Sequence, residues 1–201
     1  MGGAIRFFVC GGAALDKSVG EGLKVLGLDV LEGYGMTEAA PMISFTRHDD
    51  ICPGVSGKPL PGCDVEIREG EVCAKGRNIM KGYYKMPEAT AQAIDSDGWL
   101  HSGDICMKTE DGYYKVTGRL KDMIIRGGEN LYPVQIEDFL RRCDKIKDVA
   151  VIGLPDARLG EIAGAIIELK EGCTATEDEI NAFCNELPRY KRPKKIIFDK
   201  K

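Results

Sequence analysis

Residues 98–137 read GWLHSGDICMKTEDGYYKVTGRLKDMIIRGGENLYPVQIE, and they decide how the rest of the chain is interpreted. Asp104 comes first, Arg119 follows a Tyr-rich run, and the pair Lys121-Asp122 leads to the Gly127-Gly128 turn. Short β-prone runs separated by glycine precede Arg119, whereas apolar patterns of helical spacing follow it. We therefore expect one domain to end and another to begin within this stretch.

The first 31 residues have the pattern of a strand, a helix and a second strand. The apolar run 4–10 predicts a buried strand, and Gly11-Gly12-Ala13 turns the chain. Asp16 is placed as the N-cap of a helix over 17–26, and residues 28–31 predict the second strand. A βαβ unit implies a parallel sheet. Because two strands cannot form a stable α/β layer alone, we expect this unit to be the end of a larger sheet.

Residues 54–118 change character, because short strand-like runs alternate with Gly and Pro. The runs 65–67, 70–74 and 113–117 predict a small β-barrel or sandwich. Residues 87–94 interrupt them with one helix, which has Pro in its first turn.

The residues after Arg119 predict a compact α+β unit of about 80 residues. Helices are expected at 133–142 and 176–187, the second with acidic residues in its first turn, where the helix dipole favours negative charge. Strands are expected at 149–154, 163–169 and 196–198.

Composition excludes some classes of protein. The chain of 201 residues is 43% hydrophobic, which is enough for a sizeable core, and its formal net charge is −4. A negative balance without a long basic stripe argues against a nucleic-acid partner. The longest basic cluster, residues 189–195, is interpreted as a solvated surface turn. No apolar run reaches the length of a membrane span.

Cysteine and histidine spacing gives no metal or nucleophile motif. The eight cysteines include no C-x-x-C pair, which argues against a zinc ribbon. Several lie in apolar runs, where a thiol acts as a small hydrophobe. We expect free thiols and a cytoplasmic location. His48 and His101 are isolated in sequence, and both are interpreted as structural or peripheral.

Residues 32–38 read EGYGMTE and follow the second expected strand, at the carboxyl edge of the sheet, where open α/β folds bind ligands. Glycines at 33 and 35 permit close approach of a base or phosphate, Thr37 offers a hydroxyl, and Glu38 offers a hard oxygen for Mg²⁺. Alone, this segment fits a tight turn with a capping threonine equally well.

Together, EGYGMTE and residues 98–137 resemble the adenylate-forming superfamily, which includes acyl-CoA synthetases, nonribosomal peptide adenylation domains and insect luciferases. The resemblance covers nearly the whole chain, with the motifs in the family's order. It implies the end of the large α/β domain at 1–54, a β-barrel subdomain at 55–118, a hinge at 119–122 and an α+β lid at 123–201.

The resemblance also implies a nucleotide site. By this resemblance, one side of the adenine of ATP or AMP lies along Glu32, Gly33, Tyr34, Gly35 and Met36. The other side of the adenine is lined by Gly11, Gly12 and Ala13. Thr37 meets the α-phosphate and Glu38 the Mg²⁺ ion, so these two are the catalytic candidates. Asp104 binds the ribose hydroxyls and Arg119 approaches from the opposite side. Without the resemblance, Asp104 reads as a loop aspartate and Arg119 as a surface ion pair.

Lys121 is, by the same resemblance, the pivot about which the lid rotates, and Gly127 and Gly128 face the pantetheine arm of coenzyme A. The family's phosphate loop is expected upstream of Met1. Its adenylation lysine follows a glycine beyond the last strand, so Lys200 and Lys201 are not assigned that role.

The sequence therefore predicts part of an ATP-dependent acid–CoA ligase, a chain that we expect to be inactive alone. Its small-molecule partners are a carboxylic acid, ATP and coenzyme A, with no nucleic acid. Residues 81–90, KGYYKMPEAT, most resemble bacterial fatty-acyl-CoA ligases. The alternatives are an aryl- or amino-acid adenylating domain and a non-catalytic nucleotide-binding remnant.

Overall fold

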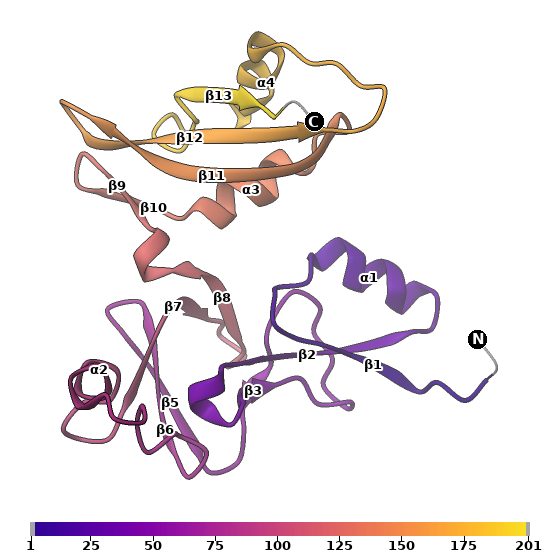
Figure 1. Ribbon diagram of the computed structural model, residues 1–201. Coiled ribbons are helices and arrows are strands. Elements are labelled where there is room, and N and C mark those ends of the chain that lie inside the picture. Colours follow the sequence, from indigo (N-terminus) through magenta and orange to yellow (C-terminus); the bar gives the residue numbers. More distant parts are fainter. Residues whose placement is uncertain (1–2, 200–201) are drawn as a thin grey trace. The chain divides into compact units, whose positions relative to one another are not determined.

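The computed structural model describes residues 3–199, which divide into two compact units between Val116 and Thr117 (Figure 1). The first unit holds two sheets and the second holds one. Each unit is described by itself below.

A βαβ unit opens the first unit, as predicted. Strand β1 (Phe7–Cys10) pairs in parallel with β2 (Asp29–Gly35), and helix α1 (Lys17–Val25) connects them (Figure 1). The Asp16 carboxylate accepts a 2.8 Å hydrogen bond from Ser18 N, which confirms Asp16 as the N-cap. The parallel register sets Cys10 opposite Glu32, so the chain leaves both strands at the same edge.

Two further strands complete this sheet in the order β1-β2-β3-β4. β3 (Met42–Phe45) runs antiparallel to β2, and β4 (Lys58–Pro59) runs antiparallel to β3. Neither strand was predicted. The 3₁₀ turn η1 (Thr37–Ala39) makes the reversal between β2 and β3.

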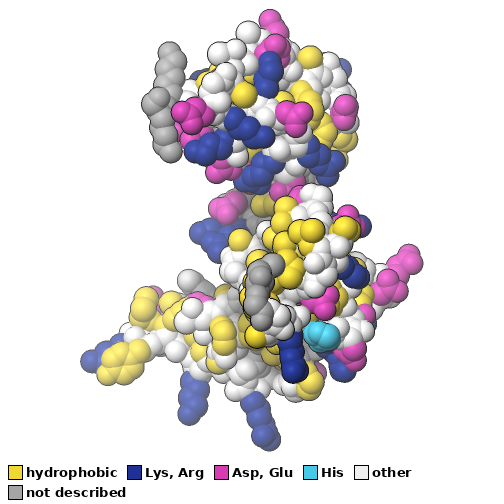
Figure 2. Space-filling model, turned by 90° about the vertical axis from the view of Figure 1, so that its right-hand side faces the viewer, with side chains coloured by type: hydrophobic (Ala, Val, Ile, Leu, Met, Phe, Trp, Pro, Cys, Tyr) yellow, Lys and Arg dark blue, Asp and Glu magenta, His cyan; other side chains and the backbone are white. Residues whose placement is uncertain are grey.

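Large hydrophobic side chains are exposed on β1, on α1 and next to them. Figure 2 faces the side of the first unit that carries these elements and shows hydrophobic side chains there. The exposed residues are Ile5, Phe7, Phe8, Val9, Val19, Val25 and Leu26. Within residues 3–199, β1 pairs only with β2, so its other edge is open.

The second sheet has the order β5-β6-β7-β8. Its strands are β5 (Cys63–Arg68), β6 (Glu71–Gly76), β7 (Leu100–Lys108) and β8 (Tyr114–Arg119). Helix α2 (Pro87–Ala93) starts with Pro at its first position, as predicted. β5 and β8 are the two ends of this path, so these strands form an open sheet in the described part of the chain and the expected closed barrel is not confirmed.

The second unit is built on a five-stranded sheet of order β10-β9-β12-β11, with β13 paired to β12. The strands are β9 (Ile124–Arg126), β10 (Glu129–Leu131), β11 (Ile146–Asp156), β12 (Gly160–Leu169) and β13 (Lys195–Phe198). The helices are α3 (Pro133–Leu140) and α4 (Glu177–Phe183), with 3₁₀ turns η2 (Leu120–Asp122) and η3 (Cys184–Glu186). The α+β prediction for this region is confirmed.

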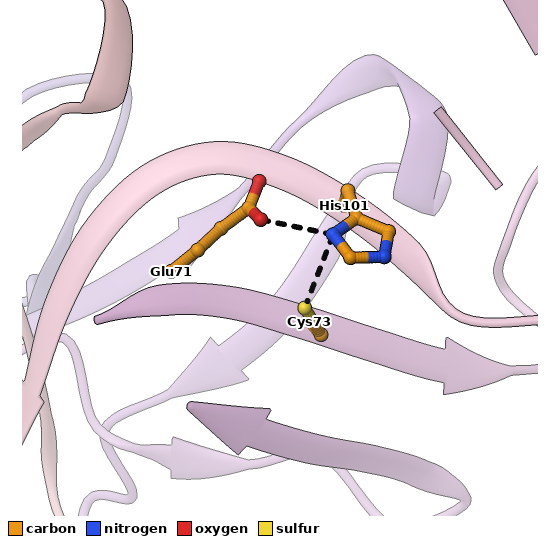
Figure 3. Close-up of side chains that lie close together, drawn as sticks. All are labelled: Glu71, Cys73 and His101. Carbon is orange, nitrogen blue, oxygen red and sulfur yellow. Dashed lines mark hydrogen bonds and ion pairs between the residues drawn. The ribbon is translucent and has the colours of Figure 1, made fainter. Parts of the chain in front are cut away.

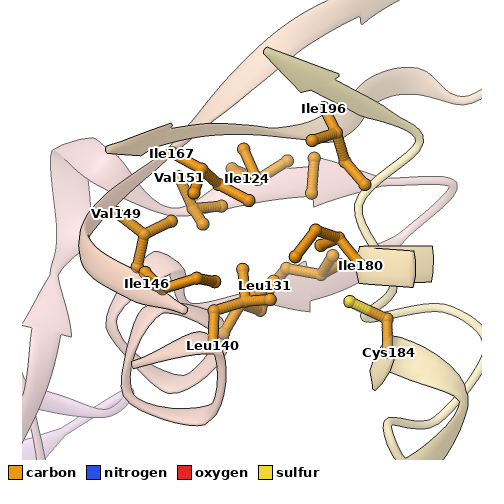
Figure 4. Close-up of a cluster of buried hydrophobic side chains, with 13 residues drawn as sticks. Ile124, Leu131, Leu140, Ile146, Val149, Val151, Ile167, Ile180, Cys184 and Ile196 are labelled. Atoms are coloured by element: carbon orange, nitrogen blue, oxygen red, sulfur yellow. The ribbon is translucent and has the colours of Figure 1, made fainter. Parts of the chain in front are cut away.

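One buried cluster joins the helices of this unit to its sheet (Figure 4). Ile136 and Leu140 of α3 meet Ile180 of α4 and the inward residues of the strands. A capping box begins α4: Thr176 Oγ1 accepts from Glu179 N, and the Glu179 carboxylate accepts from Thr176 N.

All eight cysteines lie within the described residues, and all are free thiols there. Among residues 3–199, no helix combines the length and apolar character needed to cross a bilayer.

Candidate functional site

The predicted nucleotide segments meet at the carboxyl ends of β1 and β2. Gly11 follows β1 directly, and a Cβ built on it would lie 3.7 Å from the carbonyl oxygen of Gly33 in β2. Gly12 has φ +86°, a left-handed conformation that glycine adopts without strain. Gly11, Gly12 and Ala13 are exposed. The parallel pairing thus brings two segments more than 20 residues apart to one edge.

Gly33 and Gly35 are required by the chain's own packing. A Cβ on Gly35 would lie 1.9 Å from Pro41 O, and one on Gly33 would lie 2.4 Å from Met42 Cε. The sequence interpretation had assigned these glycines to close approach by a ligand. The space that a side chain would take is instead filled by Pro41 and by Met42 of β3, so the packing of the chain by itself requires glycine at both positions.

The side chain of Glu32 is directed into the protein. Its Oε1 accepts a 2.9 Å hydrogen bond from Gly54 N, and the residue is 6% exposed. Burial raises the pKa of this carboxyl, against the lowering effect of the backbone donors. Glu32 therefore fixes the loop at Gly54 to the end of β2, which leaves its backbone for any contact with a nucleotide.

Tyr34 and Asp104 are in direct contact, although 70 residues separate them. The Tyr34 hydroxyl donates a 2.8 Å hydrogen bond to Asp104 Oδ2. Burial, and then the negative charge of Asp104, raise the pKa of Tyr34, so the phenol stays a donor at neutral pH. Asp104 was expected in a flexible loop after Ser102-Gly103. It lies instead inside β7, so its carboxylate is placed by a sheet.

Thr37 and Glu38 lie in η1, directly beyond this contact. Thr37 is exposed. The Tyr83 hydroxyl donates a 2.8 Å hydrogen bond to Glu38 Oε1. Tyr83 N in turn donates to Thr90 Oγ1 of α2, at 2.9 Å, so this helix holds the tyrosine backbone. Tyr83 was not predicted as a site residue from the sequence. The only sequence signal for it was that it lies in the segment 81–90.

The remaining predicted residues belong to the second unit. Arg119 ends β8 and Lys121 lies in η2, and both side chains are exposed. Gly127 and Gly128 form the two-residue turn between β9 and β10, with φ of +59° and +88°. Positive φ at both positions marks a type I′ hairpin turn, for which Gly-Gly is well suited. Gly127 N donates to Leu159 O at 2.8 Å, whereas nothing would contact a Cβ on Gly128. Lys200 and Lys201 lie outside the described residues.

The end of β2 thus places Tyr34 against Asp104 of the second sheet, with Thr37 and Glu38 directly beyond it in η1. Two family models match the chain: "AMP-binding enzyme" over residues 1–84 and "AMP-binding enzyme C-terminal domain" over residues 135–201. The chain belongs to the adenylate-forming family of AMP-binding enzymes.

Relatives of assigned activity match most of the chain. It is 45% identical over 186 residues to the Bacillus subtilis protein named "Putative acyl-CoA synthetase YngI", covering 85% of this chain and 34% of that protein. It is 36% identical to the medium-chain fatty-acid–CoA ligase of Escherichia coli, covering 96% of this chain and 37% of the ligase.

A solved structure gives the same assignment. The o-succinylbenzoate coenzyme A synthetase of Bacillus subtilis, in complex with ATP and magnesium ion, matches with a TM-score of 0.86 and 31% identity. The match covers 97% of this chain and 43% of that one. The chain thus spans between about a third and about two fifths of the length of these proteins.

Proposed function

We propose that this chain is part of an ATP-dependent acid–CoA ligase. Such an enzyme converts an acid and ATP to an acyl-adenylate and pyrophosphate, and coenzyme A then displaces AMP to form the thioester. The observation that carries the proposal is the Tyr34–Asp104 contact, because it joins the two residues to which the family resemblance gives the adenine and the ribose.

The nucleotide would lie along the carboxyl edge of β1 and β2. In this arrangement Gly11, Gly12 and Ala13 line one side of the adenine, and the backbone from Glu32 to Met36 with the Tyr34 ring lines the other. Asp104 accepts from the ribose hydroxyls, with Arg119 as a further contact to the nucleotide. Carboxylate acceptors make the stronger, charge-assisted kind of hydrogen bond.

Thr37 and Glu38 would act on the phosphates. Thr37 is exposed, so its hydroxyl is free to donate to the α-phosphate. Tyr83 is the donor to the Glu38 side chain among the described residues, and it uses Oε1, which leaves Oε2 for Mg²⁺. When bound, Mg²⁺ offsets phosphate charge. The chain's own groups contribute mainly by orienting the nucleotide in a fixed polar environment.

The second unit would serve coenzyme A. We propose domains at 1–54, 55–118 and 123–201, with 119–122 as the hinge and Lys121 as its pivot. The Gly127-Gly128 turn offers backbone with no Cβ and an unobstructed approach at Gly128, which suits contact with a pantetheine arm. Rotation about a short hinge between elements is a common route by which one lid serves two half-reactions.

The acid is proposed to be a fatty acid. Residues 81–90 carry the resemblance to fatty-acyl ligases, and the Escherichia coli relative is named for medium-chain fatty acids. The second candidate is an aryl acid, since the o-succinylbenzoate synthetase, named for an aromatic acid, matches 97% of the chain.

Direct titration of AMP tests the site in the 201-residue chain. We expect measurable binding, and a loss of roughly 2–4 kcal/mol in Asp104→Ala, because two charge-assisted hydrogen bonds to ribose disappear. Asp64→Ala, which removes an exposed carboxylate from strand β5 of the same sheet, is the matched control. Equal affinities of the two variants would overturn the assignment of Asp104.

The activity is tested by ATP–pyrophosphate exchange with fatty and aryl acids. We expect exchange from a ligase that contains this chain and none from the chain alone. If a ligase that contains this chain supports exchange with aryl acids but not with fatty acids, the aryl acid replaces the fatty acid as the proposed substrate.

A further inference from the structure

Glu71, Cys73 and His101 bring three different metal-binding groups together on one face of the second sheet (Figure 3). Their donor atoms all lie within 4.8 Å of one another. Glu71 and Cys73 are two residues apart in β6, so their side chains project from the same face of that strand. The register sets Cys73 opposite His101 in β7. The cluster is therefore a consequence of strand pairing.

The carboxylate of Glu71 and the thiol of Cys73 both approach the third donor, His101 Nδ1. His101 Nδ1 lies 2.9 Å from Glu71 Oε2 and 3.6 Å from Cys73 Sγ. Ligand atoms around a tetrahedral zinc ion, at metal distances of about 2.0–2.3 Å, stand roughly 3.3–3.7 Å apart. The Cys73–His101 pair already has this separation, whereas the Glu71–His101 pair has to open by under about 1 Å.

A second carboxylate stands behind the histidine. Asp95 Oδ2 lies 3.7 Å from His101 Nε2. Asp95 is itself held, by Trp99 N at 2.8 Å and by Arg68 Nη1 at 3.0 Å. A carboxylate that receives the far N–H of a ligating histidine fixes its tautomer and directs its other nitrogen at the metal. Glu71 is oriented in the same way, because its Oε1 accepts from Gly103 N at 2.7 Å and Oε2 faces the ring.

From this geometry we propose that Glu71 Oε2, Cys73 Sγ and His101 Nδ1 form a binding site for a borderline divalent cation such as Zn²⁺, with Asp95 orienting the histidine. The donor set of one sulfur, one nitrogen and one oxygen suits zinc and does not suit Mg²⁺. Cys73 is fully buried, whereas the His101 side chain is 34% exposed, so an ion can enter past the imidazole and keep a solvent ligand.

Binding releases one proton. Burial raises the pKa of the Cys73 thiol to about 11, so the thiol is neutral until an ion displaces its proton to solvent. A zinc ion would bind the imidazole through the Nδ1 lone pair, with Nε2 facing Asp95. This site is separate from the Mg²⁺ position proposed at Glu38 and does not depend on the ligase function.

The test uses the 201-residue chain freed of metal with a chelator. Zn²⁺ binding is measured by calorimetry, and Co²⁺ is added as a spectroscopic probe. We expect one ion per chain, a sulfur-to-cobalt charge-transfer band in the near ultraviolet, and a higher melting temperature with Zn²⁺. Absence of the cobalt band from the unmodified chain overturns the proposal without any variant.

Variants then locate the ion. Glu71→Gln, Cys73→Ser and His101→Asn should each abolish the tight site, and Asp95→Asn should weaken it by about 10- to 100-fold. Cys106→Ser, a buried thiol of the same strand as His101, and His48→Asn are the matched controls and should bind as the unmodified chain does. Retention of the band in Cys73→Ser, or its loss in either control, would place the ion elsewhere and overturn the proposal.

Discussion

Tyr83 and Glu38 are joined by a 2.8 Å hydrogen bond across 45 residues of sequence, from the phenol to Oε1 of the carboxylate. This contact raises the pKa of the Tyr83 hydroxyl, because ionising it would set two negative charges side by side. The phenol therefore remains a donor at neutral pH. It holds one oxygen of Glu38 and leaves the other for the Mg²⁺ ion that we propose there.

Tyr83→Phe in a ligase that carries this chain should raise the Mg²⁺ concentration needed for adenylation. A hydrogen bond to a charged group contributes about 1.5 kcal/mol at the low end, which corresponds to about tenfold. Tyr84→Phe is the matched control, since that side chain is 85% exposed. The measurement is the Mg²⁺ dependence of pyrophosphate exchange. The same shift in both variants would show that Tyr83 does not position Glu38.

Substitutions at Tyr34 should separate the ring from the hydroxyl. Tyr34→Phe removes the bond to Asp104 but keeps the ring, so AMP affinity of the chain should change by less than about 1 kcal/mol, near the net value of one hydrogen bond. Tyr34→Ala also removes the aromatic surface proposed to lie along adenine and should weaken AMP far more. Calorimetric titration of both decides this. Equal losses would mean that the phenol, not the ring, carries the contact.

Lys121→Pro in a ligase that carries this chain should separate the two half-reactions. Proline fixes φ near −65°, and a pivot that changes its dihedral angles cannot then reach both states. We expect thioester formation to fall by orders of magnitude while adenylate formation partly survives.

Timing each half-reaction separately, with purified acyl-adenylate for the second, measures the effect. The control is Lys121→Ala, which changes the same side chain without fixing φ. A proline at Lys115 would not serve as a control, because Lys115 lies within strand β8. Alanine keeps the backbone free and should leave both rates near their starting values. Equal falls in both half-reactions of the proline variant would exclude Lys121 as the pivot.

Thr176→Ala should destabilise the second unit by about 0.5–2 kcal/mol, since the side-chain acceptor of the capping box is lost. Thr174→Ala, also exposed, is the control and should have little effect. Urea unfolding followed by circular dichroism measures both. Identical midpoints would show that the box contributes nothing to stability.

Glu179, the other half of the box, gives a pH dependence. Its pKa is lowered, first by the hydrogen bond from Thr176 N and then by Lys145. A carboxyl with a lowered folded-state pKa stabilises the fold above its unfolded value and loses that contribution as pH falls through the folded value. Glu179→Gln should therefore be less stable than the unmodified chain at neutral pH and equal to it in acid. A difference that persists in acid would point to packing.

The sequence predicted local elements well where the signal was periodic or involved a cap. Asp16 ahead of α1 and Pro87 at the start of α2 marked two helices correctly. The helix expected over 176–187 is divided, because α4 ends at Phe183 and η3 continues as a 3₁₀ turn. Strand β3 was missed because its four residues are too short to show alternation and their pairing depends on distant β2.

Long-range contacts account for the other differences between the predictions made from the sequence and the structure. Asp104 could be named from its motif, but its position inside β7 and its bond to Tyr34 depend on how separate segments fold together. His101 looked isolated because its partners lie about 30 residues earlier, and only the register of β6 against β7 joins them. Spacing rules for metal sites describe ligands at short, fixed separations in the sequence. They therefore do not detect ligands that two paired strands bring together.

The open edge of β1 bears on every assay of the isolated chain proposed above. An unpaired strand edge lined with apolar side chains is a template for pairing with another chain. At the concentrations that calorimetry uses, copies of the isolated chain are expected to associate edge to edge through Phe7–Cys10. Apparent affinities would then depend on protein concentration, so each titration has to be repeated at several dilutions before a difference between variants is assigned to the bound ligand.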